Sequence, residues 1–215
     1  MKRLPPALPA FLTIGALLVS PAPVVADRVV LAPSAHITLP GDFAAASVWN
    51  VSGPGRLSWL HIGYPQEDLG LELELSAYYL NGRSRETLGI HYSVISEAAS
   101  NNLAPGVAIG IRDLPNRGHE RRSAYLALSK TMRLTEYGER LIGTLRLHAG
   151  YGSGSMGGAY LGASVHTPYR VYAAGELLAR RLNWRAAVGL AGPLSAEYLF
   201  INGRHYAGFR LHIVR

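Results

Sequence analysis

The sequence predicts an all-β protein, an antiparallel up-and-down transmembrane β-barrel of roughly 10 to 12 strands that follows an N-terminal signal peptide. Three observations predict this fold. Most of the chain alternates apolar residues with small or polar ones, turn residues separate the alternating segments, and only 16% of the 215 residues are charged. Soluble domains have about 25% charged residues. The fold has to account for this shortage of charge.

The composition excludes several classes of protein. The chain has no cysteine, which excludes a disulfide scaffold, a cysteine-ligated zinc or iron–sulfur centre and a thiol enzyme. With 48% hydrophobic residues the chain has enough apolar material to order itself, so we do not expect disorder. It has no uninterrupted apolar run of about 20 residues, which is the length that a membrane-spanning helix needs.

The N-terminus has the pattern of a secretory signal peptide. Met1–Arg3 form a basic head, Phe11–Val19 an apolar stretch, and Pro21–Ala26 a run of small residues. We expect residues 1–26 to be cleaved. The alternative is a buried N-terminal helix, but five prolines in this segment argue against it. Residues 27–41 are then an N-terminal segment, partly extended, and residues 42–215 form the barrel.

The alternation has a period of two, which is typical of strands. Over residues 69–79 the leucines occupy every second position, and Glu72 and Glu74 stand between them. A helix would distribute those leucines around its axis, whereas a strand places them on one face. The upper number of 12 strands holds if residues 42–51 add a strand before Leu57. The same pattern recurs over residues 88–94, 107–112, 144–151, 183–190 and 208–213.

Turn residues separate these segments. They are Asn81-Gly82, Pro105-Gly106, Asn116 with Gly118, Thr167-Pro168, Gly192-Pro193 and Asn202-Gly203. The connections are short, the longest candidates being residues 96–105 and 115–122. Residues 173–191 can also be interpreted as a helix, because Glu176 precedes Arg180 by four positions. We favour a hairpin there, because turn residues bracket a length that fits two strands.

The polarity of the two faces favours a membrane barrel over a soluble sandwich. A soluble sheet needs a water-facing side that is rich in Lys, Glu, Thr and Ser, whereas here the second parity is largely Gly, Ala, Ser, His and isolated charges. In a membrane barrel the apolar face meets lipid and the other face lines a lumen. Aromatic residues that we expect in interfacial girdles, rather than in an ordinary core or in turns, are Tyr64, Tyr79, Tyr137, Tyr151, Tyr169, Trp184 and Tyr206.

The charged and histidine residues of the second parity are the candidate lumen-lining residues. They are Glu72, Glu74, His91, Arg112, Arg146, His148, His166, Glu176, Arg185, Glu197, Arg210 and His212. Unpaired charge is costly in a narrow lumen, so we expect most of the arginines and glutamates to pair. Such pairs can form a charged constriction that filters solutes, or they can close the interior. For roughly 10 to 12 strands we favour a closed interior.

No cofactor, metal or catalytic residues are expected. Gly152–Gly157 matches the G-x-G-x-x-G pattern of dinucleotide-binding loops, but residues 158–165 alternate like a strand instead of opening a helix. We therefore interpret the motif as a glycine-rich turn. The chain has no H-x-x-x-H, H-E-x-x-H or G-x-S-x-G pattern. An enzyme built on the barrel would need His91, His148, His166 or His212 within about 3 Å of a Ser or Glu in a cleft.

Nucleic acid is not an expected partner, because the arginines are spread along the chain. The doublets Arg121-Arg122 and Arg180-Arg181 are predicted to lie in turns at the level of lipid headgroups.

Several strand motifs resemble one family of outer-membrane proteins. Residues 105–114 (PGVAIGIRDL), 123–130 (SAYLALSK) and 146–152 (RLHAGYG), together with residues 37–42 (ITLPGD), look like successive strands of the YjbH-like barrels linked to exopolysaccharide production. The resemblance covers most of residues 36–215. It departs from many outer-membrane barrels in that the chain does not end in an aromatic residue.

The resemblance implies an outer-membrane barrel, structural or porin-like, that assists the export or assembly of envelope polysaccharide. The implied partners are outer-membrane lipid, the outer-membrane assembly machinery, and polysaccharide or envelope proteins. Two alternatives stay open: a soluble periplasmic β-barrel that binds a lipid or glycan, and an outer-membrane barrel enzyme that acts on lipid or glycan.

Overall fold

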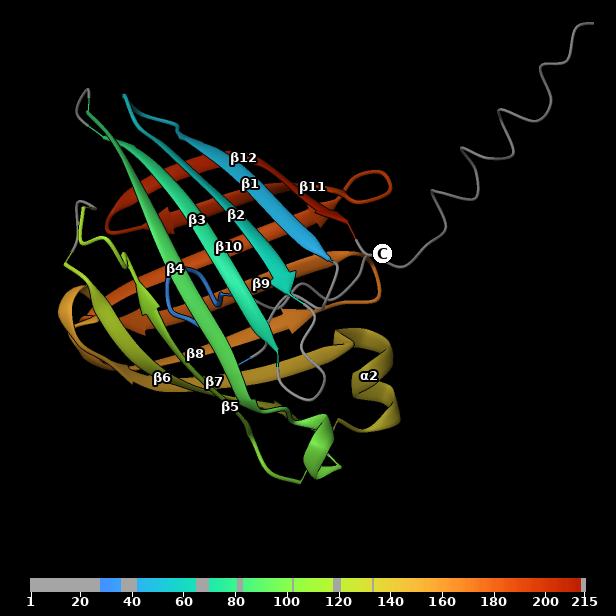
Figure 1. The fold of residues 1–215 in the computed structure, drawn as a ribbon. Helices are drawn as coiled ribbons and strands as arrows, with labels where there is room; N and C mark the ends of the chain where they lie inside the picture. Colours follow the sequence, from blue (N-terminus) through green and yellow to red (C-terminus); the bar gives the residue numbers. More distant parts are fainter. Residues whose placement is uncertain are drawn as a thin grey trace, which may run out of the picture.

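Twelve antiparallel strands form a closed up-and-down barrel in the computed structural model (Figure 1). The structure describes residues 28–35, 42–64, 70–80, 83–101, 103–117, 121–132 and 134–213. The predicted signal peptide lies outside them. The strands are β1 (Phe43–Asn50), β2 (Arg56–Tyr64), β3 (Leu71–Leu80), β4 (Arg83–Ile95), β5 (Gly106–Arg112), β6 (Ser123–Met132), β7 (Thr144–Gly152), β8 (Gly158–His166), β9 (Val171–Leu178), β10 (Arg181–Gly189), β11 (Leu194–Ile201) and β12 (Arg204–Ile213). The predicted fold class is confirmed.

Each strand pairs with its neighbours in sequence, and β12 pairs with β1 to close the barrel. The seam runs over eight residue pairs, from Phe43 opposite Ile213 to Asn50 opposite Tyr206. Closure leaves no unpaired strand edge. We call the end where β1 begins and β12 finishes the terminal end, and the opposite end the distal end.

The period-two pattern sets the face of each side chain. In β3, Glu72, Glu74 and Ser76 are buried, and Leu75 between them is exposed. Large apolar side chains are exposed on the outside of many strands, for example Leu126, Leu147, Leu161, Leu177 and Leu182. Many charged residues of the strands therefore point inward and many apolar residues point outward, which is the reverse of a soluble β-protein.

The strands that flank the predicted turns pair as hairpins, and the turn residues Asn81, Gly82 and Gly118 lie outside the described residues. Residues 173–191, for which a helix was the alternative, fall mostly in β9 and β10, which are joined at Ala179-Arg180. The β11–β12 turn places Asn202 at φ 51° and Gly203 at φ 79°, the left-handed pair that a two-residue hairpin requires. The glycine-rich motif leads through the 3-10 turn η2 (Gly154–Met156) directly into β8, as its interpretation as a turn predicts.

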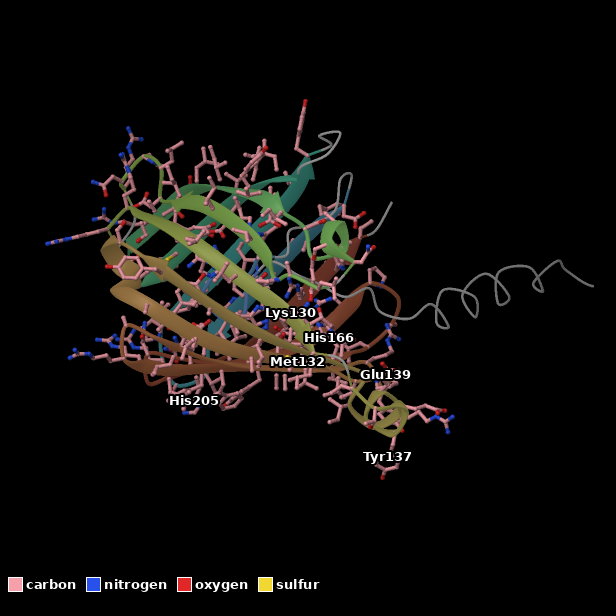
Figure 2. All side chains as sticks on the ribbon, turned by 90° about the horizontal axis from the view of Figure 1, so that it is seen from below. Lys130, Met132, Tyr137, Glu139, His166 and His205 are labelled. Carbon is pink, nitrogen blue, oxygen red and sulfur yellow. The ribbon has the colours of Figure 1, made fainter. Side chains whose placement is uncertain are left out.

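The connection between β6 and β7 holds a helix that the sequence analysis did not predict. This helix is α2 (Glu136–Ile142), and the Thr135 side chain caps it by accepting a hydrogen bond from the Gly138 backbone N–H at 3.3 Å. Two turns of helix are too short for their apolar spacing to stand out from strand alternation. Figure 2 shows Tyr137 and Glu139 on α2 beyond the barrel wall. A second short turn, η1 (Ala98–Ser100), follows β4.

One aromatic residue does not fit the predicted girdles. Tyr206 is only 3% exposed and packs in the interior beside Val48 and Leu199, so the expectation that it faces the membrane surface is wrong. It stands on the same parity as Arg210 and His212, which the sequence analysis had assigned to the interior.

Residues 28–35 lie inside the barrel and are called here the plug segment. Val29 and Ala32 are fully buried, and Val29 and Val30 pack with Val48, Leu57 and other inward residues of the wall. Figure 1 draws the segment in blue behind β4. The segment turns back on itself, since the Val29 N–H donates to the Ala32 carbonyl at 3.0 Å. Among the described residues, no helix is long and apolar enough to cross a membrane.

Candidate functional site: the lumen and its plug segment

Glu176 on β9 holds the backbone of the plug segment. Its carboxylate accepts hydrogen bonds from the N–H groups of Val30 at 2.9 Å, Leu31 at 2.9 and 3.0 Å, and Ala32 at 2.8 Å. The Asn183 side-chain amide of β10 donates to the same carboxylate at 3.0 Å. Consecutive N–H groups that converge on one buried anion form strong charge-assisted bonds. Glu176 is therefore the main anchor of the plug segment.

Arg28 is the charged contact of the plug segment with β3. Its Nε lies 3.0 Å from Glu74 Oε2, and its terminal nitrogen donates to Ser76 Oγ at 3.3 Å. The Arg28 carbonyl in turn accepts a hydrogen bond from Arg185 on β10 at 3.3 Å. Arg112 on β5 has its Nε 3.9 Å from Glu74. Glu74 thus shares its charge between two arginines, one from the plug segment and one from the wall.

Further backbone groups of the plug segment bond to the wall. Arg112 donates to the Leu31 carbonyl, Tyr160 OH donates to the Pro33 carbonyl at 3.0 Å, and the Ala35 N–H donates to Ser129 Oγ at 2.7 Å. The hydroxyl end of the Tyr160 ring lies against Gly150 of β7, where a Cβ atom would collide with it. The absence of a side chain at residue 150 therefore makes room for a tyrosine that contacts the plug segment.

The remaining candidate acids and arginines bond within the wall. Glu72 pairs with His61 Nδ1 at 3.0 Å, and Glu197 lies 3.4 Å from Arg210. Arg146 donates to Thr131 at 3.2 Å. Glu72 and Glu197 thus have local partners on neighbouring strands, whereas Arg146 bonds to a neutral hydroxyl.

The candidate histidines lie at four different places in the interior. His148 lies between two hydroxyls, with Nδ1 2.8 Å from Ser129 Oγ and Nε2 2.9 Å from Ser164 Oγ. His91 Nδ1 is 2.8 Å from the Tyr125 hydroxyl. The His166 ring packs 4.5 Å from that of Tyr172 on the neighbouring strand, and His212 near the end of β12 is buried opposite Ala44 of β1.

The serine–histidine contact of His148 meets the distance that a barrel enzyme would need. The geometry gives it a second explanation, because Ser129 Oγ accepts the Ala35 N–H while it bonds to His148. The three groups form a chain of hydrogen bonds that ends on the plug segment. His148 itself is 5% exposed.

Two interior residues, Arg28 and His61, were not among the predicted lumen-lining residues. Arg28 follows Asp27 and precedes a run of apolar residues just after the predicted cleavage site, and a charge at the start of that run is the signal that could have identified it. His61 stands on the inward parity of β2 and is fully buried. Among the described residues, no group of three His, Asp or Glu side chains could hold a metal ion.

The comparisons with known proteins give distant similarity only. No protein family matches the chain, and no curated protein matches it. Among solved structures, one triple mutant of the Rh. blastica porin is similar, with 12% identity and a TM-score of 0.37 over 73% of this chain and 55% of the porin. A second triple mutant gives 8% identity and a TM-score of 0.29 over 83% of this chain and 100% of that porin. The chain thus spans about half the length of the first porin. At these TM-scores the barrel assignment rests on the strand pairing alone.

Proposed function

We propose that this chain is an outer-membrane β-barrel that crosses the membrane with its 12 strands and is closed by its own plug segment. The observation that carries the proposal is the inverted polarity, with apolar side chains outside and buried charges inside. An apolar exterior is stable in lipid and costly in water. Lipid and the outer-membrane assembly machinery are the proposed partners.

The plug segment makes the proposed role structural or that of a closed porin. A barrel of eight strands is filled by its own side chains, whereas barrels of 16 to 18 strands hold an aqueous channel. A 12-stranded barrel lies between these sizes, and here residues 28–35 occupy its interior. We propose that ions do not pass while the segment is bound. We assign no catalysis to the barrel.

The test is conductance in planar lipid bilayers. The wild-type chain, expressed with its signal peptide and refolded or extracted in detergent, should give almost no ion current. A variant lacking residues 28–35 should give discrete current steps. Heat-modifiable gel mobility of both proteins is the control for a folded barrel. Equal current from the two folded proteins would refute closure by the plug segment, and recovery of the wild type from the soluble periplasm would refute the membrane location.

The resemblance to YjbH-like barrels supports a narrower proposal, that the barrel assists the export or assembly of envelope polysaccharide. The support is the set of strand motifs alone. Deletion of the gene in the bacterium that carries it should lower the amount of cell-surface polysaccharide, and plasmid-borne wild type should restore it. Unchanged polysaccharide would reject this narrower proposal and leave the closed barrel in place.

A further inference from the structure

The barrel has a cavity of about 670 Å³ at its distal end, and the proposed function gives no role to the residues that line it. Leu31 of the plug segment contributes to it, together with residues from the distal parts of the wall. We propose that this cavity binds an amphiphilic anion, namely a carboxylate or phosphate group that carries a single acyl chain. Its volume is in the range of small-molecule sites, about 300 to 1,000 Å³.

The charge of the lining points to an anion. Four arginines line the cavity, Arg112, Arg121, Arg181 and Arg204, and its other described lining residues include no aspartate or glutamate. Arg121, Arg181 and Arg204 are exposed and take part in none of the ion pairs between described residues. Like charges around a cavity with low-dielectric walls concentrate the electrostatic potential and attract anions.

Arg112 lies deeper than the other three arginines. Its Nε is buried without a hydrogen-bond partner, and its terminal nitrogen donates to the Leu31 carbonyl. The nearby Glu74 lies 3.9 Å from its Nε and is shared with Arg28 of the plug segment. An anionic headgroup at the rim would therefore meet three exposed guanidinium groups and, below them, the guanidinium group of Arg112.

The walls point to an acyl chain as the rest of the ligand. Leu57, Met156, Leu178 and Ile201 are buried and line the cavity, and Tyr206 is the one aromatic side chain among the described lining residues. Aliphatic walls match a hydrocarbon chain. A sugar polymer would call for several flat aromatic faces, so we do not assign the cavity to a glycan.

The route of entry favours a ligand from the aqueous phase. All 12 strands are paired around the barrel, so a lipid tail cannot enter sideways from a bilayer. The three exposed arginines stand at the β5–β6 connection and at the starts of β10 and β12, all at the distal end. A single-chain amphiphile dissolved in water can reach them there, whereas a two-chain phospholipid would have to leave its membrane.

The test uses dodecanoate with a terminal diazirine as the probe. The full-length exported protein is folded in a neutral detergent, irradiated with the probe and digested, and labelled residues are identified by mass spectrometry. We expect labels on the inward residues Leu178 and Ile201. Labels on the outward neighbours Leu177 and Leu182 report ordinary contact with the detergent-covered surface. Labelling confined to the outward residues would overturn the proposal.

Two triple variants test the role of charge. Replacing Arg121, Arg181 and Arg204 with Gln should lower inward labelling by roughly tenfold or more and leave outward labelling unchanged. Replacing the exposed arginines Arg85, Arg117 and Arg140 with Gln removes the same charge from side chains that do not line the cavity, and it should change neither. Equal inward labelling in both triple variants would overturn the anion site.

Two further ligands test whether binding needs the negative charge and whether it needs the acyl chain. Dodecanol with the same diazirine lacks the charge and should label only outward residues; equal inward labelling would overturn the need for an anion. Inorganic phosphate at millimolar concentration should compete weakly, and complete protection by it would show a free-phosphate site instead of an amphiphile site. None of these labelling experiments measures ion current. A negative result would therefore reject the anion site without bearing on the proposal that the plug segment closes the barrel.

Discussion

Glu176 is the residue on which the position of the plug segment depends most. Three backbone N–H groups and one side-chain amide converge on its carboxylate. A hydrogen bond to a charged group contributes about 1.5 to 3 kcal/mol. Replacing this carboxylate with a neutral amide should therefore weaken the binding of the whole plug segment to the wall, because an amide offers one acceptor oxygen and brings two further donors.

We predict that Glu176→Gln increases the exposure of the plug segment. The chain has no cysteine, so Val30→Cys supplies a single reporter. The rate at which a water-soluble maleimide labels Cys at this position should rise roughly tenfold or more in the Glu176→Gln background, in line with the free energy of the lost bonds. Glu86→Gln, on an exposed residue of β4, is the matched control. Equal labelling rates in the two backgrounds would contradict the anchoring role.

Glu97 stabilises the β4–β5 connection at the terminal end. It accepts hydrogen bonds from the Thr131 N–H at 2.9 Å and the Thr131 hydroxyl at 2.8 Å, and it lies 3.0 Å from Lys130 Nζ. Figure 2 labels Lys130 near this end of the barrel. Burial on its own raises the pKa of Glu97, but the bonds from Lys130 and Thr131 outweigh it and the pKa is lowered.

We predict that acid loosens this connection. A carboxylate whose pKa is lower in the folded state contributes stability above its unfolded pKa of about 4.3, and that stability is lost as the pH falls further through the folded pKa. Hydrogen exchange of the Thr131 amide, corrected for its intrinsic rate, should therefore lose protection below about pH 4. Glu97→Gln should show weak protection that does not vary with pH. A wild-type amide that keeps its protection in acid would disprove the prediction.

At the scale of the elements, the seam between β1 and β12 leaves no space for a side chain at residue 208. Gly208 lies opposite Val48 across this seam. A Cβ atom added at residue 208 would collide with the Ser47 carbonyl oxygen and lie 2.6 Å from the Val48 Cα. Both are backbone atoms, which cannot move aside as a flexible side chain can. The two strands that close the barrel would have to separate.

We predict that Gly208→Ala impairs closure of the barrel. Overpacking of this kind costs about 1 to 3 kcal/mol. The urea midpoint of unfolding, followed by tryptophan fluorescence, should fall, and less of the protein should show heat-modifiable gel mobility. Gly53→Ala is the control, because nothing lies within 4 Å of a Cβ added there. Identical midpoints for the two variants would show that the seam can relax.

At the scale of the whole molecule, the outward face decides between a membrane and a soluble location. Leu161 near the middle of β8 is 63% exposed, and Leu177 of β9 stands beside it in the pairing register. Water would not tolerate many such side chains on one surface, whereas lipid would solvate them. The proposed lipid contact can therefore be tested at one position.

We predict that Leu161→Arg reduces insertion into lipid. An arginine on the lipid face near the bilayer midplane costs about 2 to 4 kcal/mol. The yield of folded protein in lipid vesicles should fall, while Leu161→Phe should insert normally. A soluble barrel would respond in the opposite way, since an exposed arginine would leave it folded and raise its solubility. That result would overturn the lipid-facing assignment.

Local pattern was enough to predict the barrel but not its contents. Strand alternation, as in Glu72 and Glu74 between leucines, depends only on near neighbours in the chain, so the strands and hairpins could be predicted. The helix α2 was missed because two turns carry little periodic signal. Tyr206 was assigned to the girdle on its place near a strand end, although its parity indicated the interior.

The amino-acid sequence alone therefore determined the strands, their faces and the up-and-down order, because alternation with a period of two depends only on neighbouring residues. Only the tertiary structure decided where the inward charges bond. Glu176 holds Val30 from 146 positions away, and Arg28 reaches Glu74 from 46 positions away. Closure of β1 onto β12 brings such segments together, and no periodicity in a sequence encodes a partner at that separation.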